Sequence, residues 1–350
     1  SSTPQGRNSV YRQERPECCG NNSCIPICPI QAKYDATVHV ALAESVGAQV
    51  HSETTATRLN VGSDGSISSV DFRRADGSTG TATGKVVIVA AHAVETPRLL
   101  LNSAQENAPN GVANSSDQVG RNLMDHPTRL SWAEAAEPVF PYRGPLSTSG
   151  IENLRDGDFR QERGAFRIEI GNDGHSWPTG APTTTAAALA AQGLRGEELD
   201  AALKDAASRQ IRLASLVEQS PDAENRVTLD PEKRDANGVP LPRIHYDFDD
   251  YTRNGLEAAE KAHDEVFKAL GARNIQHSPD IQGAGHIIGT VRMGADASSA
   301  VVDSDLRSFD HPNLFLLGSG TFPTSATANP TLTIAALALR SVDAIAASVR

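Results

Sequence analysis

The chain has 350 residues, a formal net charge of −11 at pH 7 and 39% hydrophobic residues. This length suffices for two domains or for one large α/β domain with an insertion. Because an acidic surface repels phosphate backbones and only 5% of the residues are aromatic, we expect no nucleic-acid partner. No apolar run looks long enough to span a bilayer or to form a signal peptide, so membrane contact is expected only through a partner.

The first part of the chain predicts a helix, a meander, a buried strand and a second helix. Residues 36–47 have a helical pattern that stops at Gly47. Residues 48–84 alternate between polar and apolar types and contain Gly-Ser-Asp-Gly and Ala-Asp-Gly-Ser turns, which predicts a β-meander. The apolar run 85–91 predicts a strand buried on both faces of a parallel sheet. Thr96-Pro97 is expected to begin a helix.

The character of the sequence changes near Trp132. Residues 132–250 mix short strand-like segments with an Ala-rich helical stretch near 184–207, which indicates a second, substrate-facing domain. Residues 252–271 predict one amphipathic helix. The tail predicts a loop, a strand at 314–317 and a final Ala/Leu helix. We therefore expect a separate N-terminal segment at 1–35, a first domain at 36–130, a second, substrate-facing domain at 131–283 and a return to the first domain at 284–350.

The C-terminal tail carries the residues best suited to redox chemistry. His286 stands in a Gly-flanked loop, and a buried strand leads to Gly318-Ser319. Asn329-Pro330-Thr331 then opens the last helix, whose free N–H groups and positive dipole suit an anionic flavin ring. A His can take the proton of a substrate hydroxyl, and an Asn amide can hold the same oxygen.

This tail resembles the C-terminal signature of the GMC (glucose–methanol–choline) oxidoreductases, whose catalytic pair is a His with a His or an Asn. By motif position the resemblance implies that His286 and Asn329 are catalytic. It implies cofactor contacts at Gly318, Ser319, Pro330 and Thr331. A structural loop histidine and a helix-capping Asn are the alternatives. The order and spacing of the two residues favour the catalytic interpretation.

Three further segments resemble the family's flavin-binding regions. Residues 119–127 resemble a segment that passes along the flavin, and residues 89–100 resemble a strand–turn–helix beneath FAD. Residues 54–59 lie where the family packs a backbone edge on the adenine. The resemblance thus implies FAD contacts at Ala56, Ala91, Glu95, Asn122, Asp125 and His126. Asp125-His126 could also be an acid–base dyad, or a buried pair that braces a loop.

All four cysteines lie between Cys18 and Cys28, which indicates a metal or cluster site rather than disulfides that join distant segments. The Cys-x3-Cys-Pro end copies half of a bacterial ferredoxin ligand run. Zinc sites prefer two separated Cys-x2-Cys knuckles, which the sequence lacks. A disulfide pair stays open as an alternative.

The cysteine segment also resembles the catalytic subunits of bacterial FAD-dependent, iron–sulfur sugar dehydrogenases of the glucose and fructose type. This resemblance implies a 3Fe-4S cluster, a cytochrome c-type acceptor subunit, a small chaperone subunit and a periplasmic location. Adjacent cysteines seldom ligate one cluster, so we assign Cys18, Cys24 and Cys28 as the ligands and leave Cys19 spare.

The family's Gly-x-Gly-x-x-Gly turn, which lays the FAD pyrophosphate on a helix N-terminus, has no counterpart in the sequence. The resemblance covers only the C-terminal two-thirds of a family member. We therefore expect a mixed α/β fold with an incomplete GMC-type FAD-binding sheet and a substrate domain with an antiparallel sheet. The missing N-terminal FAD-binding segment would come from elsewhere, and alone the chain would bind FAD weakly.

The expected activity is that of an FAD-dependent dehydrogenase. It oxidises a sugar or polyol hydroxyl with His286 as base, sends hydride to flavin N5 and passes electrons through the cluster to the cytochrome. The stretch around Arg167, Glu169, Asn172, His175 and Trp177 offers the polar groups and the apolar platform that sugars need, although it could be an ordinary polar edge strand. A truncated non-catalytic homologue that acts as an interaction subunit, and an oxidase that uses oxygen, are the alternatives.

Overall fold

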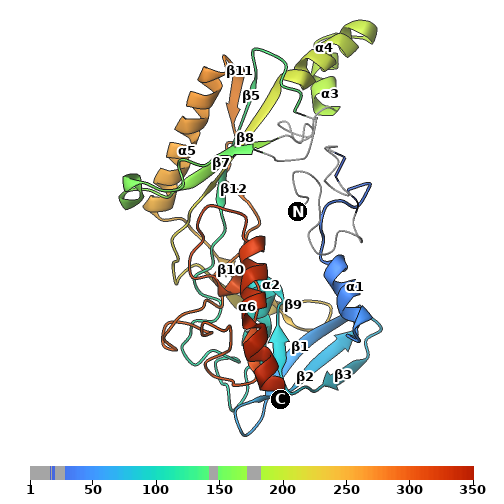
Figure 1. Cartoon of the computed structure of the whole chain (residues 1–350), viewed down its shortest axis with the longest axis vertical. Coiled ribbons are helices and arrows are strands. Elements are labelled where there is room, and N and C mark those ends of the chain that lie inside the picture. The colour runs from blue at the N-terminus through green and yellow to red at the C-terminus, as the bar shows by residue number, and fades with distance from the viewer. Residues whose placement is uncertain (1–15, 17, 20–27, 142–148, 172–182) are drawn as a thin grey trace.

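The computed structural model describes all residues except 1–15, 17, 20–27, 142–148 and 172–182. The chain forms two lobes stacked along the long axis (Figure 1). The upper lobe holds one large antiparallel sheet, and the lower lobe holds three smaller sheets and the C-terminal helix. This architecture confirms the predicted mixed α/β fold with an antiparallel sheet in the substrate region.

The lower lobe begins with α1 (Thr37–Ser45) and the predicted meander, an antiparallel sheet in the order β1-β2-β3. Its strands are β1 (Thr54–Val61), β2 (Ile67–Arg74) and β3 (Thr79–Ala82). Leu59 and Ile67 of this sheet are buried in a core cluster with Leu314, which belongs to the C-terminal part of the chain. The β1-β2-β3 sheet and the C-terminal part of the chain therefore share one hydrophobic core.

The predicted parallel strand is β4 (Val87–Val89), which is shorter than the apolar run suggested. It pairs in parallel with β13 (Leu314–Leu316). Burial on both faces is wrong for the described chain, because Ile88 is 46% exposed. A face of this two-stranded sheet is buried only where another element packs on it. Within the described residues no further strand joins the sheet.

Helix α2 (His92–Asn102) begins before Thr96-Pro97, where the sequence placed its start. Pro97 therefore lies inside the helix, and its ring nitrogen cannot donate to the carbonyl of Ala93. That carbonyl accepts a hydrogen bond from Thr290 Oγ1 at 2.6 Å instead. The proline is tolerated because a distant side chain supplies the missing donor, and the contact ties α2 to the loop that follows His286.

The upper lobe is built on a sheet in the order β11-β5-β8-β7-β6, in which β12 also pairs with β5. All of its pairings are antiparallel. The Ala-rich stretch forms two helices rather than one, since Gly193 adopts φ +98° between them. The elements are β5 (Pro127–Glu134), β6 (Ser149–Ile151), η1 (Asp158–Gln161), β7 (Phe166–Gly171), α3 (Thr183–Ala191), α4 (Gly196–Arg209), β8 (Gln210–Val217), β11 (Arg273–His277) and β12 (Gln282–Gly283).

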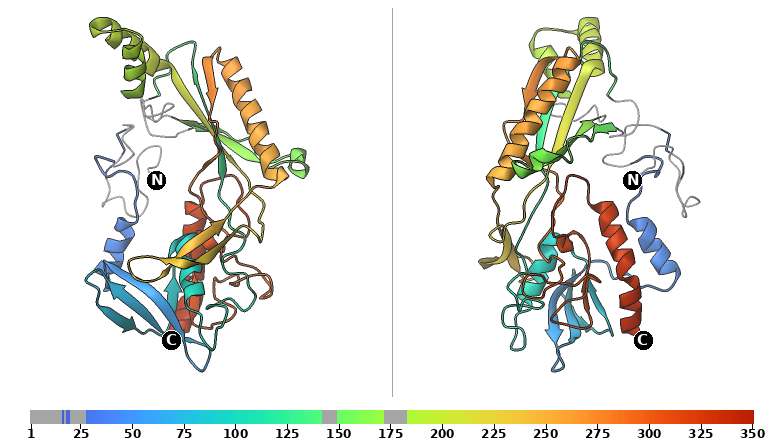
Figure 2. Two further views of the ribbon diagram at one scale, coloured as in Figure 1. Left: turned by 180° about the vertical axis from the view of Figure 1, so that it is seen from behind. Right: turned by 60° about the vertical axis from the view of Figure 1, so that its left-hand side comes forward.

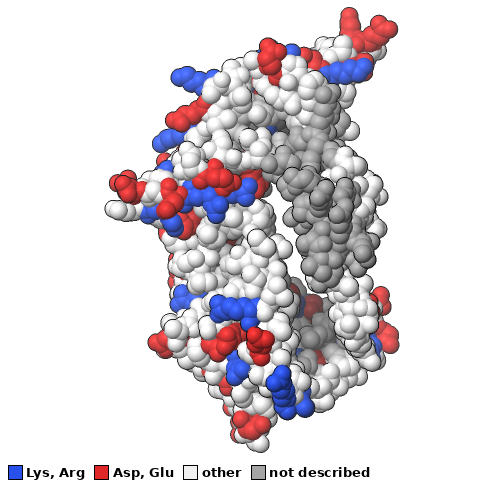
Figure 3. All heavy atoms as spheres, in the orientation of Figure 1, with Lys and Arg blue, Asp and Glu red and all other residues white. Residues whose placement is uncertain are grey.

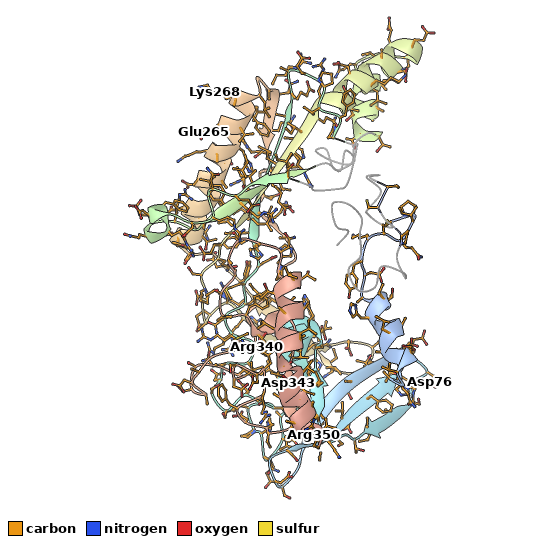
Figure 4. The ribbon with its side chains drawn as sticks, in the orientation of Figure 1. Asp76, Glu265, Lys268, Arg340, Asp343 and Arg350 are labelled. Atoms are coloured by element: carbon orange, nitrogen blue, oxygen red, sulfur yellow. The ribbon has the colours of Figure 1, made fainter. Side chains whose placement is uncertain are left out.

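Helix α5 (Asp250–Ala269) packs on this sheet, as its amphipathic pattern predicts. The Asp249 side chain caps the helix by accepting from the backbone N–H of Thr252 at 2.8 Å. Leu256 and Phe267 are buried in the core that α5 shares with the sheet. Figure 4 shows Glu265 and Lys268 on the outer side of the helix.

The hairpin of β9 (Arg226–Arg234) and β10 (Pro240–His245) lies against α2 in the lower lobe, although its sequence falls within 131–283. Arg98 of α2 fixes this hairpin. Its guanidinium donates to Asp235 Oδ2 at 2.7 Å and to the carbonyl of Pro240 at 2.7 Å. The chain therefore returns to the lower lobe well before residue 284.

Helix α6 (Thr331–Val349) closes the chain and follows the short 3-10 turn η2 (Ser319–Thr321). By length and composition α6 could cross a membrane, so the expectation that no apolar run is long enough is wrong on that test. One such helix is weak evidence, because core helices of soluble proteins pass the same test. The described residues leave it largely uncovered, with Leu332 82% and Leu339 74% exposed. Figure 2 shows α6 (red) extending along the lower lobe.

On the face drawn in Figure 3, acidic and basic side chains are interspersed along the whole molecule. No block of one sign dominates this face, which offers no continuous basic track for a nucleic-acid backbone.

Candidate active site

Two backbone segments from distant parts of the chain run antiparallel and create the site. The N–H and C=O groups of Met124 and Ile288 exchange hydrogen bonds of 3.0 and 2.9 Å, and the N–H of Ala284 donates to the carbonyl of His126 at 3.1 Å. Gly289 adopts φ +97°, and a Cβ there would lie 2.0 Å from the carbonyl oxygen of Asn122. Only glycine permits this approach, which brings His126 beside His286.

Asp125 holds the turn of the His286 loop. Its Oδ1 accepts from the backbone N–H groups of His126 and His286, both at 2.7 Å, and its Oδ2 accepts from Gly285 N–H at 3.2 Å. Gln219 Oε1 in turn accepts from the Asp125 N–H at 3.0 Å. The carboxylate thus binds three backbone donors, which is the geometry of a loop brace rather than of an acid–base dyad.

The two predicted catalytic side chains meet. Asn329 Nδ2 lies 3.3 Å from His286 Nε2, and His286 Nδ1 lies 3.1 Å from His126 Nδ1. The rings of His126 and His286 stand edge to face at an interplanar angle of 82°. His126 is fully buried, His286 is half-buried and Asn329 is exposed, so Nε2 of His286 is on the accessible side of the pair.

Both histidines are held in the neutral form. Burial lowers the pKa of His126, with a further decrease from the neighbouring His286 and an opposing increase from Ser325 and Asp125. Burial also lowers the pKa of His286, against increases from Asp125 and Glu169. A neutral imidazole at neutral pH has one lone pair that can accept a proton, as a general base requires.

Strand β7 supplies two polar side chains next to this pair. Arg167 Nη1 lies 3.4 Å from Asn329 Oδ1, and its Nη2 forms an ion pair with Glu169 Oε1 at 3.2 Å. These are the first two residues of the stretch predicted to bind sugar. The other three, Asn172, His175 and Trp177, lie outside the described residues.

The N-terminus of α6 follows Asn329 directly. The first hydrogen bond at this end of the helix runs from Ile334 N–H to the carbonyl of Pro330 at 3.0 Å. The N–H groups of Thr331, Leu332 and Thr333 precede it, so they are the donors that a helix leaves for an external partner. Thr331 is exposed and Pro330 is buried. This end of α6 can receive an anionic edge of a cofactor.

Three of the residues predicted to contact FAD lie at the carboxyl edge of β4 and β13: Ala91, Gly318 and Ser319. Leu317 N–H donates to the carbonyl of Val89 at 2.8 Å, so Ala91 and Gly318 leave the same edge of the parallel pair. Gly318 turns the chain with φ +106°, and Ser319 follows it, buried. Ligands of parallel α/β sheets bind at this edge.

A cavity of about 320 Å³ lies beside this edge and is lined by Ala56, Ala91 and Glu95 together. Two segments that the sequence matched separately to FAD contacts, 54–59 and 89–100, therefore share one cavity. Arg98 and Asp235 also line it and were missed, since only the tertiary contact between α2 and the distant hairpin pairs them. A larger cavity of about 480 Å³, at residues such as Asn107 and His311, contains none of the predicted site residues.

Of the predicted cluster ligands, Cys18 and Cys28 are described and Cys24 is not. Among the described residues no group of three or more His, Cys, Asp or Glu side chains could hold a metal ion. Burial by itself raises the pKa of the Cys28 thiol. Hydrogen bonds from the backbone of 30–33 outweigh this and lower the pKa. The cluster stays a prediction.

Comparison with known proteins identifies the family. Two family models described as GMC oxidoreductase match residues 221–338 and 5–128. The chain is 37% identical over 342 residues to the fructose dehydrogenase large subunit of Gluconobacter japonicus, covering 98% of this chain and 62% of that protein. It is 29% identical over 358 residues to paromamine 6'-oxidase of Streptomyces fradiae, covering 98% of this chain and 61% of that protein. The chain spans about three-fifths of the length of these relatives.

Solved structures agree on the fold. Pyridoxine 4-oxidase from Mesorbium loti aligns with a TM-score of 0.57 at 19% identity, over 84% of this chain and 57% of that one. Formate oxidase from Aspergillus oryzae RIB40 aligns with a TM-score of 0.60 at 18% identity, over 84% of this chain and 60% of that one. The matches to both family models and the shared fold agree with the motifs read from the sequence: the chain belongs to the GMC oxidoreductase family.

Proposed function

We propose that the chain is the flavin-side and substrate-side part of an FAD-dependent dehydrogenase that oxidises a hydroxyl of a sugar or polyol. One observation carries this proposal: His286 Nε2 and Asn329 Nδ2 lie 3.3 Å apart, and Asn329 directly precedes Pro330, the N-cap of α6. A base and an amide donor thus converge on one point, as deprotonation of an alcohol requires. FAD, when bound, supplies the hydride acceptor.

The chain's own residues divide the work. His286 takes the hydroxyl proton on Nε2, and Asn329 donates to the same substrate oxygen as negative charge develops on it. The cavity lined by Ala56, Ala91 and Glu95 would hold the nucleotide part of FAD. The flavin part would contact Gly318, Ser319, Pro330 and Thr331, together with Asn122, Asp125 and His126.

Two observations support a carbohydrate-like substrate. The relatives include proteins named fructose dehydrogenase large subunit and paromamine 6'-oxidase. Arg167 and Glu169 stand beside the catalytic pair and offer donors and acceptors to neighbouring hydroxyls. Such clustered polar groups suit a polyhydroxylated molecule better than a simple alcohol.

A further segment with the pyrophosphate-binding turn would complete the FAD site. The exposed face of α6 and the exposed Ile88 of the two-stranded β4–β13 sheet support this, because both are apolar surfaces that such a segment would cover. The relatives, which are longer than this chain, are consistent with it.

We also propose the 3Fe-4S cluster on Cys18, Cys24 and Cys28 as the exit for electrons toward a cytochrome c-type subunit. The lowered pKa of Cys28 favours the thiolate, which is the form that binds iron. The name of the 37% identical relative, a large subunit, is consistent with a multi-subunit assembly, to which a small chaperone subunit would also belong. The assembly would be periplasmic and peripheral to the membrane through its partner.

The cluster is tested by metal analysis and electron paramagnetic resonance on the assembled protein. Cys24→Ser is expected to abolish the iron signal and electron flow to the cytochrome while sugar still reduces FAD. Zinc, or no iron, in the wild-type assembly would leave an oxidase as the better function. Relatives named oxidases, such as C-glycoside 3-oxidase of Arthrobacter globiformis, favour that second candidate.

The activity itself is tested by anaerobic bleaching of the flavin absorbance. Fructose, glucose and sorbitol are expected to bleach it, and ethanol is not. An assembly that binds no flavin would support the third candidate, a non-catalytic interaction subunit. Bleaching by ethanol alone would refute the sugar assignment.

A further inference from the structure

A continuous chain of hydrogen bonds runs through the catalytic pair. It begins at the carbonyl of Ser325, which lies 2.9 Å from His126 Nε2. It passes from His126 Nδ1 to His286 Nδ1 at 3.1 Å and from His286 Nε2 to Asn329 Nδ2 at 3.3 Å. It ends where Asn329 Oδ1 meets Arg167 Nη1 at 3.4 Å. The two end groups differ in kind: a carbonyl only accepts, and a guanidinium only donates.

The carbonyl of Ser325 determines which ring nitrogen carries the proton in both His126 and His286. Because a carbonyl cannot donate, the proton of neutral His126 is on Nε2, and Nδ1 is left with a lone pair. His286 must then donate to that lone pair from its own Nδ1. A neutral ring carries one N–H, so Nε2 of His286 is unprotonated.

The Arg167 end gives the same answer independently. Because the guanidinium cannot accept, the amide oxygen of Asn329 faces Arg167. The NH₂ group of Asn329 therefore faces His286, where it can donate only to an unprotonated Nε2. The Ser325 carbonyl and the Arg167 guanidinium, at opposite ends of this series of hydrogen bonds, thus impose one direction on every hydrogen bond between them.

Building on the proposed function, we propose that His126 and Arg167 are positioning residues that hold His286 in the Nδ1–H tautomer. The accessible Nε2 is then unprotonated, and its lone pair, which accepts from Asn329 in this structure, can take a proton from a substrate hydroxyl that displaces the amide. When it does, the O–H bond of the substrate breaks and an Nε2–H bond forms. His286 continues to donate its Nδ1–H hydrogen bond to His126. In the opposite tautomer Nε2 would already carry a proton, and His286 could not act as a base at that atom.

Burial makes His126 the stronger of the two positioning residues. Its ring is 0% exposed, so no solvent can replace the acceptor that it presents to His286. Arg167 has an exposed partner in Asn329 and acts only through the orientation of that amide. Loss of His126 is therefore expected to let His286 populate both tautomers. Loss of Arg167 is expected only to weaken the preference for the Nδ1–H tautomer.

The test is nitrogen NMR of the whole chain labelled with ¹⁵N-histidine, because it reads the tautomer without substrate or flavin. In the wild type His286 is expected to show a protonated Nδ1 and an unprotonated Nε2, and His126 the reverse. Signals are assigned by their loss in His286→Ala and His126→Phe. In His126→Phe both tautomers of His286 are expected to be populated. The ¹⁵N chemical shifts of its two ring nitrogens should then move toward a common, averaged value.

Two variants separate positioning from damage to the fold. His126→Asn places an amide oxygen near the position of Nδ1 and is expected to restore the wild-type tautomer. His311→Phe removes another buried histidine, whose ring nitrogens bond the backbone of Gly65 and Ala113, and is expected to leave His286 unchanged. A wild-type His286 protonated on Nε2, or one unaffected by His126→Phe, would overturn the proposal.

Kinetics of the FAD-loaded assembly give a second readout. His126→Phe is expected to lower kcat by about tenfold or more with little change in KM, because the base rather than substrate binding is altered. His126→Asn is expected to recover part of that loss. If the tautomer is as proposed and no sugar reduces the flavin, the proposed function fails and the positioning assignment stands.

Discussion

His263 is a buried histidine whose stability contribution can be worked out from its surroundings. It lies on α5 and is 0% exposed. Its Nδ1 lies 2.7 Å from Ser131 Oγ and its Nε2 lies 2.8 Å from Ser215 Oγ. Burial, followed by the neighbouring His277 and Arg129, lowers its pKa to about 3. The serine hydroxyls satisfy the neutral ring, and no carboxylate is among the causes of the shift to offset a positive charge.

The direction of the pH effect follows from this lowered pKa. Below about pH 6.5, the ordinary pKa of a histidine, His263 is protonated in the unfolded chain but stays neutral in the folded chain. The free energy of unfolding therefore falls as the pH falls. Between pH 7 and pH 5 the loss amounts to about 2 kcal/mol from this one residue. The folded pKa lies well below this window, so the ordinary pKa sets the size of the loss.

Urea unfolding at the two pH values measures this loss. Trp132 on β5 reports the same sheet, and a Trp177→Phe background leaves it as the sole tryptophan. His263→Gln is expected to lower stability at pH 7 and to remove about 2 kcal/mol from the pH-dependent decrease. His51→Gln, at an exposed site, is expected to leave the decrease unchanged. Equal decreases in His263→Gln and its parent would refute this account.

Three further predictions concern the site. His286→Ala is expected to cut turnover by about 10²–10⁴-fold with FAD retained, and Asn329→Ala to cut it less; near-full activity of the first at neutral pH would contradict its role as base. Gly289→Ala is expected to destabilise the chain by more than about 2 kcal/mol in thermal unfolding, because its Cβ would lie 2.0 Å from the Asn122 carbonyl oxygen. Arg98→Met is expected to cost about 1–3 kcal/mol in urea unfolding and to weaken FAD binding in titrations, since the Asp235 carboxylate and the Pro240 carbonyl lose their donor. Unchanged FAD affinity would show that the cofactor does not occupy the cavity that Arg98 lines.

The sequence alone predicted the local elements and the motif residues. Apolar periodicity, turn residues and β-branched runs located the meander, helix α5, the strand before Gly318 and the final helix, because these signals depend only on near neighbours along the chain. The same reading identified His286 and Asn329 by motif, and the structure brings them within 3.3 Å. The predicted element boundaries were wrong where a distant side chain made a locally unfavourable residue acceptable. Helix α2 continues through Pro97 because Thr290 donates to the carbonyl that the proline leaves unpaired.

Tertiary structure decided which residues act together. Nothing local to Asp125-His126 shows that the carboxylate braces the His286 loop while the imidazole bonds the His286 ring. Arg98 likewise gives no sign in the sequence that it holds the hairpin through Asp235. Hydrogen bonds and ion pairs of this kind join residues more than a hundred positions apart, and their partners are fixed only when these distant segments pack together. The sequence therefore determined the chemical groups available to the site, and packing decided their protonation, orientation and neighbours.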